Sequence, residues 1–510
     1  MQPVPGLACP ACRSELRTDG EAKLICDACG ASYPVFDGIP SFVVPSPHPD
    51  PPPHAGEGND PLLPPQPGEG KVLDGGRDRR PQLTVLVSSP HPDIAREPGG
   101  EEDFDGLLNA LRQELRSLGI EYELIVLDTG STYGRALRRG LEQAAGEYVL
   151  TLDADGSHDP SFLEAIWAAR SEAEVVIASR YTEGGSADMP RTRRALSRLL
   201  NGALRRGLSL PSSDLSSGYR LYRRVAVAAL PLQATGFDIL QEILIRMVAE
   251  GYRVREVPFH YEAPGRSRAW LARFAASNLK TFGAMWKLRN SIASADYDAR
   301  AYDSPIPLQR YWQRRRYQVI TTMAAGAQRV LDVGCGSSRI IGSARMVALD
   351  IVLGKLRYAR RYGNPLVHGS IFELPFKDAS FDCVICSEVV EHVPADERVF
   401  SELERVLEPG GRLILGTPDY DRRRWRALEW LYGRLAPGGY ADEHITHYGR
   451  TNLAAYFQAR GLTVEAVKYV AGSEMVFLLR KSAAPVPVVS PFPIAASLRG
   501  ARRETAASVQ

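Results

Sequence analysis

Two apolar segments of this chain each end in residues that can bind a phosphate or a nucleoside. Residues 148–152 read Tyr-Val-Leu-Thr-Leu and lead into Asp153 and Asp155, and residues 329–333 lead into a Gly-Cys-Gly turn at 334–336. Across residues 82–290, short β-branched stretches alternate with amphipathic helical ones, which predicts a parallel sheet with ligands at the carboxyl ends of its strands. The two endings therefore indicate two transferase chemistries in one chain.

Length and composition exclude several classes of protein. The chain has 510 residues, 44% apolar and 24% charged, which is typical of several soluble domains rather than one core. A net charge of +2 gives no indication of nucleic-acid binding. No apolar run reaches the ~18 residues of a membrane span. The N-terminus lacks the pattern of a secretory signal, so we expect a cytoplasmic protein.

Proline marks the boundaries between these domains. Residues 45–80 are rich in proline, glycine and acids, which predicts an extended linker. Residues 483–510, rich in Pro, Ala and Arg, predict a disordered tail. We therefore expect folded domains at 1–44, 81–292 and 293–482.

Four cysteines near the N-terminus form a C-x2-C-x13-C-x2-C pattern: Cys9, Cys12, Cys26 and Cys29. Two disulfides are the alternative, but the expected compartment is reducing. Four thiolates closing a tetrahedral zinc site is the favoured interpretation, and such a site is structural. With the following Tyr-Pro-Val-Phe-Asp-Gly-Ile-Pro at 33–40, residues 7–44 resemble the zinc ribbons that activate methyltransferases, which implies a docking module.

Asp153 and Asp155 could both face one metal ion, because they are separated by a single residue after a strand. An ordinary surface turn is the alternative for an isolated Asp-Ala-Asp-Gly. Two downstream segments accompany it here, Ala-Ser-Arg-Tyr at 178–181 and Ser-Asp-Leu-Ser-Ser-Gly-Tyr-Arg at 213–220. Together these motifs resemble the dolichol-phosphate mannosyltransferase-like inverting glycosyltransferases of the GT-A fold, over residues 82–268.

This resemblance implies sugar transfer from a nucleotide sugar to a polyprenyl phosphate or other lipid-linked acceptor. By motif, Asp153 and Asp155 bind Mg²⁺ or Mn²⁺, and Asp128 contacts the nucleoside. Arg180, Arg194 and Ser217 lie near the acceptor phosphate, and Arg180 is a candidate catalytic residue. Asp214 and Arg220 fix that loop, and Glu242 matches a later acid of the family.

The chain departs from this family at the nucleotide-binding segments. Residues 128–133 read Asp-Thr-Gly-Ser-Thr-Tyr where the family has more carboxylates, and residues 88–93 replace a Tyr-Asn-Glu turn. The alternative is therefore a degenerate glycosyltransferase domain that only binds, beside an active methyltransferase. A third hypothesis is an assembly scaffold in which neither site is active.

Arginine is concentrated in two segments without acids, 191–206 and 266–289. An amphipathic helix that packs its apolar stripe into the core is one interpretation. The other is an interfacial helix that brings the domain to anionic lipid at the inner face of the membrane. Peripheral membrane contact would suit a lipid-phosphate acceptor.

The third region places Asp332 before Gly334 and Gly336, and a second apolar run ends at Asp350. Glycines at a strand end allow a cofactor to approach the backbone, and an acid ending the next strand accepts ribose hydroxyls. With Ser-Phe-Asp-Cys-Val-Ile-Cys-Ser-Glu-Val-Val-Glu-His at 380–392, the region resembles class I methyltransferases dependent on S-adenosylmethionine, with a Rossmann-like fold. By motif, the cofactor is held by Asp332, Gly334, Gly336, Asp350, Ser370, Ile371 and Ser387.

Three histidines are candidates for the base that such an enzyme needs when its acceptor is a hydroxyl or amine. His392 follows Glu391, and His444 and His447 follow an aromatic insert where these enzymes build acceptor pockets. A structural role is the alternative for each. We predict that His392 and His444 are the candidate catalytic residues.

Overall fold

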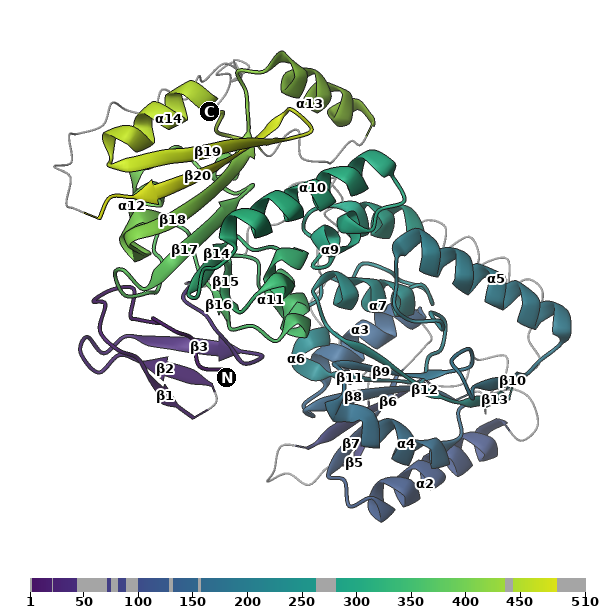
Figure 1. The fold of residues 1–510 in the computed structure, drawn as a ribbon. Coiled ribbons are helices and arrows are strands. Elements are labelled where there is room, and N and C mark those ends of the chain that lie inside the picture. The colour runs from purple at the N-terminus through teal and green to yellow at the C-terminus, as the bar shows by residue number, and fades with distance from the viewer. Residues whose placement is uncertain are drawn as a thin grey trace, which may run out of the picture. The chain divides into compact units, whose positions relative to one another are not determined.

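The computed structural model describes residues 2–20, 22–43, 71–74, 81–88, 100–127, 132–154, 157–262, 281–435 and 444–483 (Figure 1). Asp128 and Asp155 lie outside these residues, as do most of the predicted linker and the predicted tail. The chain divides into two compact units, one formed by Met1–Asp50 with Ser291–Gln510 and the other by Pro51–Asn290. Each is described by itself.

The N-terminal ribbon is a small antiparallel sheet of four strands in sequential order. These are β1 (Arg17–Asp19), β2 (Lys23–Ile25), β3 (Ser32–Phe36) and β4 (Ile39–Pro40). One cysteine pair precedes β1 and the other lies between β2 and β3. The sheet buries few large side chains of its own, so the cysteines are the main candidates for holding it together.

The unit Pro51–Asn290 is built on a seven-stranded sheet of order β12-β9-β11-β8-β6-β7-β5. Its strands are β5 (Lys71–Asp74), β6 (Leu83–Ser88), β7 (Tyr122–Leu127), β8 (Tyr148–Asp153), β9 (Val175–Ser179), β11 (Arg220–Arg223) and β12 (Val254–Pro258). Strand β6 pairs in parallel with β7 and β8, whereas β11 runs antiparallel to both β8 and β9. Residues 71–74, which composition assigns to the linker, form an antiparallel edge strand on β7.

Helices cover both faces of this sheet. They include α2 (Gly100–Ser117), α3 (Tyr133–Gln143), α4 (Leu163–Ala168), α5 (Arg191–Leu208), α6 (Arg224–Val227) and α7 (Ile239–Ala249). Alternate residues of β6 serve opposite faces: Leu86 packs in one core with α3 and α7, and Val85 and Val87 pack in another with α2 and α4. This follows from the two-residue period of a strand. A separate two-stranded sheet pairs β10 (Ser186–Asp188) with β13 (His260–Glu262).

The other unit contains a second seven-stranded sheet, of order β16-β15-β14-β17-β18-β20-β19. Its strands are β14 (Val330–Val333), β15 (Met346–Asp350), β16 (Leu366–His368), β17 (Phe381–Ser387), β18 (Leu407–Pro418), β19 (Leu462–Val470) and β20 (Glu474–Lys481). The strands from β16 to β18 are parallel, and β20 is antiparallel to both neighbours. Its helices include α9 (Tyr297–Tyr302), α10 (Pro307–Ala324), α11 (Leu353–Ala359), α12 (Glu397–Val406), α13 (Arg423–Leu435) and α14 (Arg450–Ala459).

The ribbon packs against the β16 edge of this second sheet, within the same unit. The Phe42 amide donates to the His368 carbonyl at 2.8 Å, and the Ala8 amide donates to the Pro375 carbonyl at 2.9 Å. The Lys377 amide returns a bond to the Gly6 carbonyl at 2.8 Å. These bonds satisfy backbone groups at an edge that would otherwise lack partners.

Side chains strengthen the same contact. Arg357 donates to Asp37 at 2.8 Å with both side chains largely buried, and Arg13 donates to the Leu374 carbonyl at 2.9 Å. His368 donates from Nε2 to the Ile351 carbonyl at 2.9 Å, so its Nδ1 accepts from the Ser41 hydroxyl at 2.7 Å. The docking partner that sequence left unassigned is therefore this sheet edge of the same chain.

Replacing Cys26 by serine tests whether the cysteine cluster maintains this docking. We expect Cys26→Ser to unfold the ribbon, so that hydrogen exchange at the amides of Ala8, Phe42 and Lys377 accelerates at least about 10-fold. Arg17→Ala is the matched control, because its ion pair with Asp27 lies on the ribbon's exposed surface. Unchanged protection at these amides in Cys26→Ser would contradict the prediction.

Candidate active sites and zinc site

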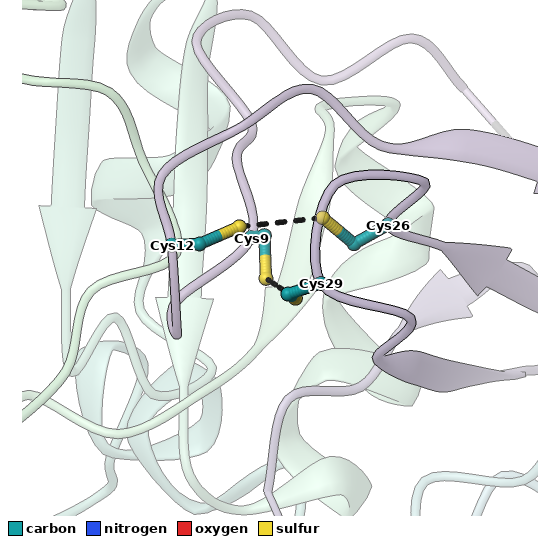
Figure 2. Close-up of side chains that lie close together, drawn as sticks. All are labelled: Cys9, Cys12, Cys26 and Cys29. Carbon is teal, nitrogen blue, oxygen red and sulfur yellow. Dashed lines mark hydrogen bonds between the residues drawn. The ribbon is translucent and has the colours of Figure 1, made fainter.

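The four N-terminal sulfurs converge on one point (Figure 2). Cys9 Sγ lies 3.6 Å from Cys29 Sγ, and Cys12 Sγ lies 3.4 Å from Cys26 Sγ. A disulfide would require about 2.05 Å, whereas four thiolates at about 2.3 Å from a zinc ion lie roughly 3.8 Å apart. All four cysteines are free thiols, so the geometry fits a structural zinc site rather than two disulfides.

A cavity of about 560 Å³ lies at the carboxyl ends of β14, β15 and β17. It is lined by all seven residues predicted to hold the cofactor: Asp332, Gly334, Gly336, Asp350, Ser370, Ile371 and Ser387. Two glycines make room for it. Both have positive φ angles, and a Cβ at Gly334 would lie 2.3 Å from Val389, while one at Gly336 would lie 2.5 Å from Asp298. The turn therefore requires glycine at both positions.

Asp350 holds this turn against the second strand. Its Oδ2 accepts from the Gly336 amide at 2.7 Å, and its Oδ1 accepts from the Val352 amide at 2.8 Å. Burial raises the pKa of Asp350, and Lys355 and these amides counter the increase. Lone pairs of the carboxylate remain for ligand hydroxyls, since a carboxylate offers about four acceptor positions.

Asp332 is a buried acid of the cavity wall with no cation beside it. It is only 4% exposed, and its Oδ2 has no hydrogen-bond partner among the described residues. Burial, followed by repulsion from Asp350, raises its pKa to about 7. A buried acid without a partner at a cavity wall favours a cationic ligand, which restores the charged form.

In the other unit, Asp153 ends β8 beside the loop that follows α5. A Cβ at Gly218 would lie 2.7 Å from Asp153 Oδ2, so the loop approaches the carboxylate as closely as a glycine allows. Ser88, at the end of β6, donates to Asp153 Oδ1 at 3.4 Å, and the Asp153 amide donates to His158 Nδ1 at 2.9 Å. Two strand ends and one loop thus meet at this carboxylate.

Arg180 and Asp214 hold that loop in place. The guanidinium donates twice to the carboxylate at 2.7 Å, and Asp214 Oδ1 also accepts from the amides of Ser216 and Ser217 at 3.2 and 3.1 Å. Burial alone would raise the pKa of Asp214, but Arg180 lowers it below its usual value. Arg220 donates to the carbonyls of Leu240 at 2.5 Å and Leu215 at 2.8 Å.

The remaining predicted residues of this unit lie in separate contacts. Arg194, on α5, donates to the Ala187 carbonyl. Glu242, buried on α7, accepts from the amides of Gln233 and Ala234 and from Arg246. These contacts hold loops and helices together.

Comparison with known proteins assigns each region. Family models match residues 7–38 (Trm112p-like protein), 105–230 (Glycosyl transferase family 2) and 331–415 (Methyltransferase domain). An undecaprenyl-phosphate mannosyltransferase of Micrococcus luteus is 32% identical over 189 residues, covering 36% of this chain and 74% of the relative. A protein of Encephalitozoon cuniculi described as a methyltransferase is 31% identical over 173 residues, covering 32% of this chain and 79% of the relative.

The chain joins a family 2 glycosyltransferase to a methyltransferase. A dolichol-phosphate mannosyltransferase of Pyrococcus furiosus is also 29% identical over 204 residues, covering 34% of this chain and 55% of the relative. The predicted combination of ribbon, glycosyltransferase and methyltransferase is confirmed. The match across 105–230 includes the altered segment 128–133 and gives no sign of a degenerate domain.

The methyltransferase implies S-adenosylmethionine, and its cavity fits that cofactor. The cofactor carries a positive sulfonium and a nucleoside, which suit the uncompensated carboxylate of Asp332 and the glycine turn. Sequence reasoning missed Asp298, which accepts from the Ser337 amide at 3.0 Å and from Lys355 at 3.1 Å beneath Gly336. Burial alone would raise the pKa of Asp298, but Lys355 and Ser337 lower it. Asp298 precedes β14 on a helix, so no strand-end pattern marks it.

Glu388 is a second residue that sequence reasoning missed. It follows Ser387 at the end of β17, lines the cavity and has a φ of 59°. A positive φ is strained for a non-glycine residue. Arg316 donates to Glu388 at 2.8 Å and to Glu474 at 2.8 Å. Its place directly after a strand was a signal that could have identified it.

The predicted histidines separate into two groups. His392 and His444 line the methyltransferase cavity with Trp425, from the aromatic insert. His447 instead stacks on Tyr420, with ring centroids 3.9 Å apart. His444 is therefore better placed than His447 to contact an acceptor.

The raised pKa of Asp332 predicts a pH-dependent stability. The folded state retains a proton that the unfolded chain releases between about pH 4 and about pH 7, so the free energy of unfolding falls as pH rises through that window. We expect Asp332→Asn to reduce the part of this fall between about pH 5 and about pH 8 by up to about 3 kcal/mol, since about two pH units separate pH 5 from the folded-state pKa. Calorimetry of both proteins at about pH 5 and about pH 8 measures it. Parallel pH dependence in the two proteins would show that Asp332 ionises normally.

Proposed function

We propose that the glycosyltransferase transfers a sugar from a nucleotide sugar to a polyprenyl phosphate. The observation that carries this proposal is the contact of Asp153 with the loop at Gly218, which brings the expected donor and acceptor elements to one sheet edge. The relatives from Micrococcus luteus and Pyrococcus furiosus, named for undecaprenyl and dolichol phosphate, support the acceptor class.

The main requirement of this reaction is neutralisation of the negative charge on the departing diphosphate, and a general base is less important. A phosphate oxygen of the acceptor is already anionic, so it can form the bond to the anomeric carbon while the bond to the nucleotide diphosphate breaks. Asp153, with Asp155, would hold Mg²⁺ or Mn²⁺, which neutralises the departing diphosphate. Arg180 acts as a positioning residue, since its guanidinium is bonded to Asp214 and Ser216.

We propose that the methyltransferase uses S-adenosylmethionine to methylate a small molecule, a sugar or a lipid-linked intermediate. The cofactor supplies an electrophilic methyl group on sulfur. Asp332 and the glycine turn would hold its charged end, and Asp350 would hold its ribose. His392, His444 and Trp425 line the part of the cavity left for the acceptor. Proximity provides most of the catalysis in such a displacement.

Asp153→Asn tests the glycosyl half. With a panel of labelled nucleotide sugars, polyprenyl phosphate and Mn²⁺, we expect this variant to transfer label on the order of 10²- to 10³-fold more slowly, because diphosphate neutralisation is lost. Asp188→Asn is the control, since that carboxylate is exposed on β10. Calorimetry should show that both variants fold. Equal label from Asp153→Asn and the parent protein would remove Asp153 from the mechanism.

Helix α5 supports contact with anionic lipid. The exposed fractions of Leu196, Leu199 and Leu200 are 49%, 68% and 42%, and the helix contains no acid. Four arginines on it are also exposed: Arg191, Arg198, Arg205 and Arg206. No helix in the described part of the chain is long and apolar enough to span a membrane. Each basic residue near an anionic surface contributes about 1 kcal/mol, enough in sum for reversible binding at the inner face of the membrane.

The double variant Leu196→Glu with Leu199→Glu tests this contact. We expect at least about 10-fold weaker cosedimentation with vesicles containing phosphatidylglycerol, because charged side chains no longer enter the lipid interface. Val225→Glu is the matched control, since Val225 is equally exposed on α6 of the same unit. Equal sedimentation of the double variant and the control would exclude α5 as the binding element.

A further inference from the structure

Three potential metal ligands from two distant segments meet at the acceptor side of the methyltransferase cavity. Glu391 and His392 lie on the short helix η5 (Val390–His392), and His444 lies in the loop before α14. One ligand atom from each lies within 4.8 Å of the others. The amides of Ile445 and Thr446 donate to the Glu391 carbonyl at 2.9 and 3.1 Å, so the loop is tied to η5.

The carboxylate of Glu391 is incompletely satisfied. Its side chain is fully buried, and Oε2 accepts from the Thr417 hydroxyl at 3.1 Å. Oε1 has no hydrogen-bond partner within the described part of the chain. Leaving such an oxygen unpaired in a buried site is unfavourable. A cation beside Oε1 would supply the partner that this buried oxygen lacks.

His444 is oriented as a ligand. Its Nδ1 lies 3.1 Å from Glu429 Oε1, and Tyr420 donates its hydroxyl hydrogen to the same carboxylate oxygen at 2.6 Å. Tyr420 Oη also lies 2.8 Å from Nδ1, and because its hydrogen is directed at Glu429, this oxygen is an acceptor for Nδ1. Nδ1 therefore carries the hydrogen, which leaves the Nε2 lone pair available. Metal-binding histidines are typically fixed in this way by a carboxylate on the other nitrogen.

We propose that Glu391, His392 and His444 bind a divalent first-row transition-metal ion at the wall of the methyltransferase cavity. Two imidazoles and one carboxylate form a ligand set that such ions favour, and three protein ligands leave coordination positions open. Bonds of about 2.1 Å place ligand atoms roughly 3–3.5 Å apart, so binding would draw these atoms closer together than their present separation of up to 4.8 Å. The cation also gives Glu391 Oε1 the partner that it lacks.

This site deepens the proposed methyltransferase function, on which its chemical role rests, by naming the acceptor class. An ion held by Glu391, His392 and His444 would supply a Lewis acid at the cavity wall: an acceptor hydroxyl bound at its open position would have a lowered pKa and would lose its proton to solvent. The oxygen then forms a bond to the methyl carbon, and the carbon–sulfur bond breaks with its electron pair remaining on sulfur. The acceptor is therefore a hydroxyl compound.

Cobalt binding to the full-length chain tests the site without any methyl acceptor. Co²⁺ in the ribbon gives a thiolate charge-transfer band, whereas Co²⁺ bound by nitrogen and oxygen gives only weaker d–d bands. The titration is done on the Asp153→Ala background, so that the glycosyltransferase carboxylates do not contribute. We expect a second cobalt ion per chain without thiolate character, and its loss in His444→Ala.

Three further variants separate ligand loss from misfolding. His447→Ala should retain the second ion, because His447 stacks on Tyr420 outside the cluster. Glu429→Gln should weaken the second site about 10- to 100-fold without abolishing it. Cys26→Ser should remove the thiolate band and leave the second site intact. Equal cobalt binding by the parent chain and His444→Ala would overturn the proposal.

The test of the metal site and the test of methyl transfer can give different results. Cobalt binding that depends on His444, without methylation of any acceptor, would support the metal site and count against methylation. Methylation of a hydroxyl acceptor that is insensitive to His444→Ala, with no second cobalt ion, would overturn the metal site alone. The Glu429–His444 pair would then act without a metal.

Discussion

Each half of the chain depends on one buried carboxylate that ties a loop at its candidate site to the end of a strand. Asp350 accepts from the amide of Gly336, and Asp214 accepts from Arg180 and from the amides of Ser216 and Ser217. Neither loop has regular secondary structure, so its backbone donors need acceptors from elsewhere. A neutral or shorter side chain at either position would leave those donors unpaired, and the loop would lose its place at the sheet edge.

Sequence predicted the parts of the fold that depend on local pattern. The apolar strands leading into Asp153 and Gly334 are strands β8 and β14, and each pairs in parallel with a neighbouring strand. Pairing between distant segments was not predictable in the same way. Strand β11 enters its sheet antiparallel between β8 and β9, and residues 71–74 form an edge strand despite a linker-like composition. Register between strands depends on tertiary contacts, which local periodicity does not record.

In the candidate sites, too, residues marked by a local pattern were predictable and residues defined by tertiary contacts were not. Residues in the last positions of strands, such as Asp332 and Asp350, were found because a strand end predicts their position. Asp298 and Glu429 were missed because they lie on helices whose local sequence resembles any exposed helix. Each acquires its role from residues that are distant in sequence. Asp298 contacts Lys355 and the Gly336 turn, and Glu429 contacts His444. A charged residue that acts by positioning another residue is not marked by any local motif in a single sequence.

The ribbon shows how an element without chemistry of its own can bear on a site. Strand β16 is the edge of the methyltransferase sheet, and the residues that follow it, Ser370 and Ile371, line the cavity. Exposed edges tend to fray or to pair with other chains. The ribbon covers this edge, and Ser41 reaches His368, whose other nitrogen bonds to the carbonyl of Ile351. Ile351 also lines the cavity, directly after Asp350. Hydrogen bonds therefore connect the ribbon to the cavity wall beside Asp350, and loosening of the ribbon would affect that wall first.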